Sequence, residues 1–239
     1  MSASQEPAAR SSGRSGMWRG QSPAQRSAVR RQQLLAAGLE VFGTSGWQQS
    51  TVRGICAAAG LSERYFYESF TSRDDLLLAV YDDLNEREYL MFSQAATERL
   101  DGIDSPDDQA LMSVLHNALL AWFATFKADP RVARVRLIEV LGVSTQIEER
   151  YRAHNRRIAD LIRAVSARSG HVDETAAIVG TVTTGLVGAA TVIATDWYLS
   201  GFQLPLDCVI AAAEAIFRGV LVESREFAVH QVRREPFSI

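Results

Sequence analysis

Residues 51–70 read TVRGICAAAGLSERYFYESF, two short helical patterns on either side of a glycine. In the first pattern Val52, Ile55 and Ala58 recur about every three residues and form one apolar stripe. Gly60 supplies the left-handed backbone conformation that a tight turn between two helices requires. The arrangement predicts a helix-turn-helix, a motif that places the start of its second helix in the major groove of DNA. A helical hairpin inside an unrelated α-helical protein would show the same pattern.

The second pattern exposes side chains that suit nucleic acid. Phe66 and Phe70 lie four residues apart, so we expect both to face the core, and Ser62 is placed to cap the helix. The outward residues, in some combination, are then Glu63, Arg64, Tyr65 and Tyr67. An arginine and two tyrosines on one short helix match base edges and phosphates better than they match bulk solvent.

The composition of the 239-residue chain is that of a globular protein, with 47% hydrophobic and 22% charged residues. These proportions exclude a largely disordered chain, a collagen-like repeat and a small scaffold held by disulfides. Cys56 and Cys208 lie far apart in the sequence and are expected to be reduced thiols. The first twenty residues contain no apolar run, so we expect no secretory signal and a cytoplasmic protein.

The formal net charge of −3 conceals an asymmetry along the chain. Residues 1–80 contain nine arginines and six acidic residues, whereas residues 81–239 contain 16 basic and 22 acidic residues. The basic excess is strongest in residues 1–31. A basic arm ahead of an acidic body is compatible with a polyanionic partner, and equally with a solvated tail.

Helical periodicity runs through the chain without any sustained two-residue alternation, which predicts an all-α fold. Prolines after capping residues mark helix starts, and six glycines mark the expected ends: Gly46, Gly60, Gly102, Gly142, Gly170 and Gly201. The expected helices lie near 24–44, 51–58, 62–68, 73–98, 106–127, 130–141, 144–168, 173–199 and 205–229.

The segment 30–81 as a whole resembles the DNA-binding domain of the TetR family of transcriptional regulators. The resemblance rests on five blocks in the expected order: LLAAGLEVF at 34–42, Gly46-Trp47, Thr51-Val52-Arg53, AAGLS at 58–62 with Phe66-Tyr67-x-x-Phe70, and SRDDL at 72–76. It implies a disordered basic arm at 1–22, a three-helix helix-turn-helix DNA-binding domain at 23–72, a helical-bundle ligand-binding and dimerisation domain at 73–230, and a tail at 231–239.

The resemblance implies phosphate contacts on both sides of the recognition helix. Thr51 and Arg53 look like phosphate contacts at the start of the preceding helix. Tyr67 would donate its hydroxyl to a phosphate. Arg73 stands where the family usually has a phosphate-binding lysine, and Ser72 before it belongs to the same expected DNA-binding surface.

Base reading is expected from the recognition helix itself, which begins at Ser62. Arg64 can bridge guanine O6 and N7, and Tyr65 can meet a thymine methyl, while Glu63 faces either a cytosine amine or solvent. Two positions depart from the family pattern. Many members have glycine at the position of Arg64. Many have histidine or arginine at the position of Glu68, and we expect the Glu68 carboxylate to form an ion pair with Arg64 or Arg73.

The resemblance also implies an effector pocket between the central helices of the body. The expected pocket residues are Trp122, Phe126, Tyr151, His154, Thr184 and Trp197. Taken singly, each of them more commonly packs in a core or, for the histidine, is a hydrogen-bonded core residue. Aromatic side chains mixed with isolated polar groups fit a mainly apolar small molecule.

Residues 176–194 contain no charged side chain, a length within reach of a membrane span. The flanking Asp173 and Asp196 and the many small residues argue against that alternative. In the family, the last two long helices pair with their copies across a two-fold axis. We therefore expect a homodimer through helices 173–199 and 205–229, with Gly180, Gly185 and Gly188 permitting close approach.

These observations predict a ligand-responsive transcriptional repressor that binds palindromic operator DNA as a homodimer. A small, mainly apolar effector would tilt helix 73–98 and change the separation of the two recognition helices. An activator of the same fold, and a helical ligand-sensing protein that does not bind DNA, remain the alternatives.

An enzyme would need a constellation of catalytic side chains, and the sequence contains none. The four histidines make no metal-binding spacing, and there is no glycine-rich phosphate loop. Glu148, His154 and Asp160 do not share one face of a helix. We expect no cofactor, no metal site and no catalytic activity.

Overall fold

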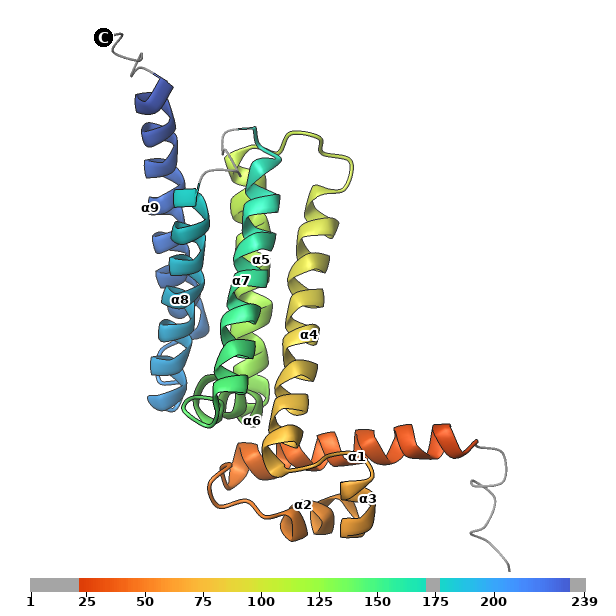
Figure 1. Ribbon diagram of the computed structural model, residues 1–239. Coiled ribbons are helices and arrows are strands. Elements are labelled where there is room, and N and C mark those ends of the chain that lie inside the picture. The colour runs from red at the N-terminus through yellow and green to blue at the C-terminus, as the bar shows by residue number, and fades with distance from the viewer. Residues whose placement is uncertain (1–21, 171–176, 233–239) are drawn as a thin grey trace, which may run out of the picture.

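The computed structural model describes residues 22–170 and 177–232, and every regular element within these ranges is helical. The helices form a base and an upright body (Figure 1). α1 (Pro23–Thr44) runs across the base with the short helices α2 (Val52–Ala59) and α3 (Glu63–Tyr67) beneath it. The prediction of an all-α fold is confirmed.

The sequence of α1 contains its own start signal. The Ser22 hydroxyl accepts a hydrogen bond from the Gln25 N–H, the Gln25 side chain accepts one from the Ser22 N–H, and Pro23 occupies the first helical position. The buried residues of the helix are Leu34, Leu35, Ala37, Gly38 and Phe42. This face packs against α2, α3 and the first turns of the long helix that begins at Arg73.

The turn between α2 and α3 depends on Gly60, whose φ is +65°. The Gly60 N–H donates to the Ala57 carbonyl at 3.2 Å, and the Leu61 N–H donates to the Cys56 carbonyl at 3.0 Å. α3 has five residues, too few for a helix to be stable alone, so its position depends on burial of Phe66, which is 0% exposed. The helix-turn-helix geometry is therefore fixed by one glycine and one buried ring.

The long helix α4 (Arg73–Leu100) belongs to two hydrophobic cores. Its first turns, from Leu76 to Leu84, join the core of α1–α3, together with Val135, Val140 and Ile147 from the body. Its later turns lie beside the second core, against which Met91 and Phe92 pack. The division of the chain at residue 72 stays a prediction, because α4 contributes side chains to both parts.

The body is a bundle in which neighbouring helices run in opposite directions (Figure 1). Besides α4 it contains α5 (Asp108–Ala128), α6 (Pro130–Arg134), α7 (Thr145–Ala167), α8 (Ala177–Leu199) and α9 (Leu206–Val232). Its core is built mainly by α5, α8 and α9 around buried aromatic rings. α8 and α9 lie together at one side of the bundle.

Two element boundaries differ from the sequence prediction. The N-cap residue of α5 is Asp107, whose carboxylate accepts from the Ala110 N–H at 2.8 Å. The sequence favours Ser105, before Pro106, for this position. The segment expected as one helix over 130–141 divides into α6 and a π-helix, η1 (Val135–Glu139). All six glycines expected to end helices have positive φ.

The segment α6–η1 joins the body to α1. Arg131 packs so closely on Gly43 that a Cβ at that position would overlap its backbone, and it pairs with Glu40. Arg134 donates to the Thr44 carbonyl at 2.5 Å, and Glu139 accepts from the backbone N–H of Trp47 at 2.7 Å. These contacts satisfy backbone groups at the end of α1 and hold the base of the molecule against the body.

Some sequence predictions fall outside the described residues. These are the basic arm except Ser22, the tail from residue 233, and the expected start of the helix at 173–199. The structure therefore provides no description of a contact made by the arm.

Candidate functional site

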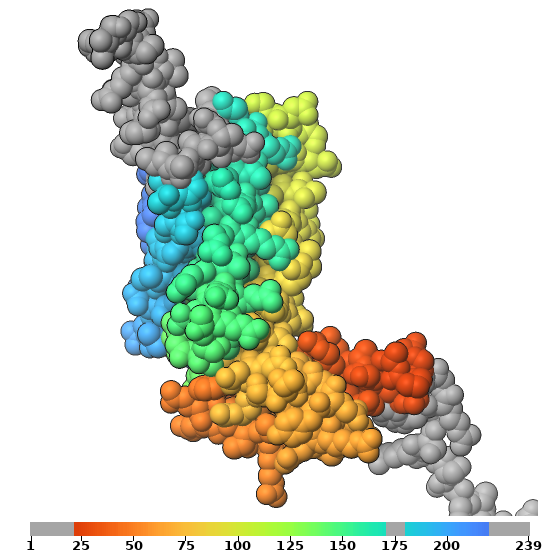
Figure 2. Space-filling model, viewed as in Figure 1, coloured from red at the N-terminus to blue at the C-terminus, as the bar shows by residue number. Residues whose placement is uncertain are grey.

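The surface formed by α2 and α3 faces away from the body, at the base of the molecule (Figure 2). The predicted DNA-binding residues that are exposed are Thr51, Arg53, Ser62, Glu63, Arg64, Tyr65, Tyr67 and Ser72. Arg64 is the most open, with 84% of its side chain exposed, and Tyr67 is 59% exposed. The structure thus brings together on one accessible face an arginine and two tyrosines.

Two hydroxyl-bearing residues of this surface, Thr51 and Ser72, cap helices with their side chains. The Thr51 hydroxyl accepts from the Gly54 N–H at 3.0 Å, and the Ser72 hydroxyl accepts from the Asp75 N–H at 3.1 Å. Ser62 begins α3 without a side-chain capping bond. Because a hydroxyl that accepts can still donate, Thr51 and Ser72 retain a hydrogen for an external acceptor such as a phosphate oxygen.

Arg73 is the one predicted DNA-binding residue that is not fully exposed. Its guanidinium donates to the Trp47 carbonyl at 3.1 Å and to the Ser50 carbonyl, and it lies 5.1 Å from the Trp47 ring centroid. The loop between α1 and α2 leaves these carbonyls without helical partners, and the guanidinium satisfies them. In this structure Arg73 therefore fixes the loop before the helix-turn-helix, and its expected phosphate contact stays a prediction.

Glu68 lies between two arginines at the edge of the recognition helix. Its carboxylate accepts from Arg64 Nε at 3.2 Å and pairs with Arg30 Nη2 at 3.3 Å. The Arg30 guanidinium also lies 4.4 Å from the Tyr65 ring centroid, so Tyr65 leans toward α1. The expected pair with Arg64 is present, and the partner that sequence reasoning missed is Arg30, 38 residues away.

A cavity of about 440 Å³ lies within the body between α4, α5, α7, α8 and α9. Its wall is mostly aliphatic and aromatic, as in sites for small apolar ligands. The lining side chains include Phe92, Leu111, Leu115, Trp122, Ile158, Ile162, Leu186, Val187 and Phe217, with Glu88, Arg136, Asn155, Arg163, Ser166, Thr183 and Thr191 among the polar ones.

Of the six residues expected to line a pocket, Trp122 lines this cavity. Phe126 and Trp197 instead fill the second core, because large rings bury the most apolar area where helices cross. Tyr151 packs against the first core. Thr184 is exposed and donates to the Gly180 carbonyl one turn back, as threonine in a helix commonly does.

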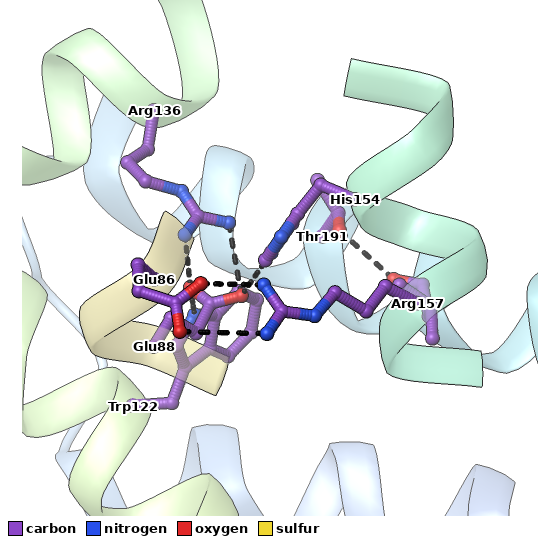
Figure 3. Close-up of polar contacts among 8 residues, drawn as sticks. Glu86, Glu88, Trp122, Arg136, His154, Arg157 and Thr191 are labelled. Carbon is purple, nitrogen blue, oxygen red and sulfur yellow. Dashed lines mark hydrogen bonds and ion pairs between the residues drawn. The ribbon is translucent and has the colours of Figure 1, made fainter. Parts of the chain in front are cut away.

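His154 does not line the cavity but contacts Glu88, which does. Together with Trp122 and Arg136 these two residues form a buried polar cluster that we call the cavity floor (Figure 3). The Glu88 carboxylate accepts from Trp122 Nε1 at 2.6 Å and from Arg136 Nη2 at 3.0 Å, and its Oε1 lies 2.9 Å from His154 Nε2. A second contact joins Arg136 to the other carboxylate oxygen. All four residues are less than 10% exposed.

The charge state of Glu88 follows from these partners. Burial alone raises the pKa of a carboxyl group, but the Arg136 charge and the hydrogen bonds from His154 and Trp122 outweigh burial and hold the pKa of Glu88 below its ordinary value. Glu88 is therefore an ionised carboxylate inside the protein. Sequence reasoning missed it, since a single glutamate within the acid-rich helix 73–98 carries no local signal of burial.

Two further classes of site are not found. Among the described residues, no group of three or more histidine, cysteine, aspartate or glutamate side chains is arranged to hold a metal ion. In the same residues no helix has the length and apolar character that crossing a bilayer would demand.

An exposed helix-turn-helix joined by α4 to a cavity-bearing helical body defines a class of DNA-binding regulatory protein. The comparison with family models agrees, because residues 34–80 match the bacterial regulatory proteins of the tetR family. The matched segment spans the second half of α1, the helix-turn-helix and the first turns of α4, so the DNA-binding part of the chain is similar to that of this family. A comparison with curated proteins finds no match.

Solved structures share the fold over most of the chain. FadR from Bacillus subtilis, solved in complex with stearoyl-CoA, is 17% identical, with a TM-score of 0.62 over 81% of this chain and 98% of that one. SmeT, the repressor of the Stenotrophomonas maltophilia multidrug efflux pump SmeDEF, is 16% identical, with a TM-score of 0.59 over 77% and 86%. A TetR-like regulator from Rhodococcus sp. RHA1 is 23% identical, with a TM-score of 0.57 over 81% and 97%.

The position of Glu68 leads to a prediction about DNA specificity. Glu68→Gln removes an anion that neutralises Arg30 and Arg64 at the surface facing DNA. We expect random duplex DNA to bind about 3- to 10-fold more tightly, and the slope of log affinity against log salt to steepen by roughly one. Fluorescence anisotropy with a labelled random duplex at several salt concentrations measures both quantities.

Glu63→Gln is the matched control, because it makes the same charge change at the other end of the recognition helix, where Glu63 is the first residue of α3 and Glu68 directly follows its last. No ion pair of Glu63 occurs in the described part of the chain. Equal gains in affinity for the two variants would show that overall charge, and not the pairing of Glu68, sets the effect.

Proposed function

We propose that this protein is a ligand-responsive transcriptional repressor that binds palindromic operator DNA as a homodimer and is released by a small, mainly apolar effector. The observation that carries the proposal is the continuity of α4, which lines the cavity at Glu88, Phe92 and Ala96 and belongs to the core of the DNA-binding helices at Leu76 and Leu77. One rigid helix therefore touches both the effector site and the DNA-binding part.

Within the DNA-binding surface we assign different roles to different side chains. Arg64, at the start of the recognition helix and almost fully exposed, reads a base, and Tyr65 beside it meets a thymine methyl. Arg53, Tyr67 and the cap hydroxyl of Thr51 position the helix on phosphates. Their shared exposure on one face supports this division.

The outer face of α8 and α9 supports a two-fold dimer. Val192 is 60% exposed and Leu199 65% exposed on α8, and Ile216 on α9 is 41% exposed. A Cβ added at Gly185 or Gly188 would meet nothing within 4 Å, so no neighbour in the same chain requires these glycines. An apolar stripe with small residues at helical spacing suits close packing against a second copy.

The effector and the direction of regulation are supported by the solved relatives. FadR was solved with stearoyl-CoA, a ligand with a long apolar chain, and SmeT is a repressor. The mainly apolar cavity of this chain fits a ligand of similar character. A ligand releases DNA only if it binds the low-affinity conformation more tightly than the DNA-bound one, and contact with α4 provides a route to that difference.

The assignment of Arg64 is tested with the operator recovered by random-sequence selection on the purified protein. Arg64→Ala is expected to cost about 1–3 kcal/mol of binding free energy on that operator and to relax selectivity at one base pair in each half-site. Arg53→Ala is the matched control, because a phosphate contact should weaken operator and random DNA alike. Identical losses for both variants on both DNAs would refute the division of roles.

The proposed dimer is tested by Val192→Glu, which places a charge on the outer face of α8. We expect a monomer in sedimentation velocity and a loss of operator affinity of about 100-fold or more, because two linked half-site contacts become one. Leu90→Glu is the control, since Leu90 is 57% exposed on α4, away from the proposed interface. A Val192→Glu variant that sediments as a dimer would exclude this interface.

A further inference from the structure

The cavity extends along the axis of the bundle. Its lining extends from Glu88 to Ala96 on α4, from Leu111 to Trp122 on α5 and from Asn155 to Ser166 on α7. At the rise of an α-helix these spans correspond to a length of about 12–17 Å. A space of this length accommodates an extended apolar chain.

The cavity floor lies at the end of this space nearest the DNA-binding helices. Glu88 is the first lining residue of α4, Trp122 the last of α5, and Arg136 comes from η1, which packs beside α1. Figure 3 shows the four floor residues converging on the Glu88 carboxylate, while Glu86 pairs separately with Arg157. The inner end of a bound ligand therefore meets the Glu88–Arg136 pair.

The Glu88–Arg136 ion pair carries no net charge. Both carboxylate oxygens of Glu88 have partners from Trp122, Arg136 and His154. The positive charge of Arg136 is matched by the one negative charge beside it. An anionic head group placed here would face the Glu88 carboxylate without a free counter-charge. A cationic head group would face the Arg136 guanidinium. Because the site is buried, the binding free energy of either charged group is unfavourable.

Two buried nitrogens of Arg136 have no hydrogen-bond partner in the described part of the chain: Nε, and Nη1, which contacts Glu88 as an ion pair. The Nε has neither kind of contact with Glu88. A single oxygen acceptor at the inner end of a ligand would satisfy this N–H without adding charge.

We infer that the effector class is an uncharged, extended apolar molecule with one oxygen acceptor at its inner end, such as a long-chain alcohol or ester, and that the Glu88–Arg136 pair selects against a free carboxylate at that end. The inference rests on the proposed function, which takes this cavity as the effector site. It adds a prediction about the charge at the inner end of the ligand, which the cavity volume alone does not provide.

The test uses three ten-carbon probes that differ at one end: decan-1-ol, decanoate and decylammonium, each titrated into the intact protein at pH 7.5 by isothermal calorimetry. For the unaltered protein, decan-1-ol is expected to bind at least about tenfold more tightly than either charged probe. This comparison requires no variant.

Glu88→Gln tests the cause. The variant keeps the side-chain volume and removes the anion, so the Arg136 charge lacks its partner. Decanoate affinity is expected to rise at least about tenfold, and decanoate is expected to raise the melting temperature of this variant more than decan-1-ol does. Glu86→Gln is the matched control: it removes a carboxylate two residues away that pairs with Arg157 at the surface, and it should leave the order of the three probes unchanged.

The outcomes separate the two proposals. Decanoate binding the unaltered protein as tightly as decan-1-ol overturns the selectivity rule and leaves the cavity as an effector site. If none of the three probes binds, the cavity itself is overturned as the site, together with the inference. Should Glu88→Gln not fold, the comparison in the unaltered protein still decides the rule.

Discussion

The buried ion pair between Glu88 and Arg136 is the interaction on which the arrangement of this protein most depends. It ties α4 to η1 inside a mainly apolar bundle, at the place where the cavity ends. Removing one member of such a pair leaves an uncompensated buried charge, which typically costs about 3–5 kcal/mol. Any ligand in the cavity must therefore fit around this pair, and any movement of the pair displaces α4 relative to η1.

The same two elements hold the DNA-binding helices. Arg134 at the end of α6 and Glu139 at the end of η1 bind backbone groups at the end of α1 and just after it. The first turns of α4 share a core with α2 and α3. Arg73, at the start of α4, fixes the loop that leads into α2. The cavity floor and the recognition helix are thus connected through two helical segments, and a change in their relative position has a direct structural route to DNA.

The local parts of this account could be predicted from sequence and the long-range parts could not. Gly60, Phe66 and the exposed arginine and tyrosines follow from spacing within twenty residues. The hydrogen-bond partners of Glu88 lie 34, 48 and 66 residues away in the sequence, so no local pattern indicates that Glu88 is buried and paired. The family resemblance implies Phe126 and Trp197 as pocket residues, but large rings also fill cores, and a sequence pattern alone does not distinguish the two places.

The central claim is that occupation of the cavity changes the separation of the two recognition helices. Its most direct test is the distance between spin labels at Gln48→Cys in the two protomers, in a Cys208→Ser background, measured by double electron–electron resonance. The account predicts one distance distribution with operator DNA and a shifted distribution once decan-1-ol fills the cavity and DNA dissociates. An unchanged distribution, with calorimetry showing the ligand bound, would contradict it.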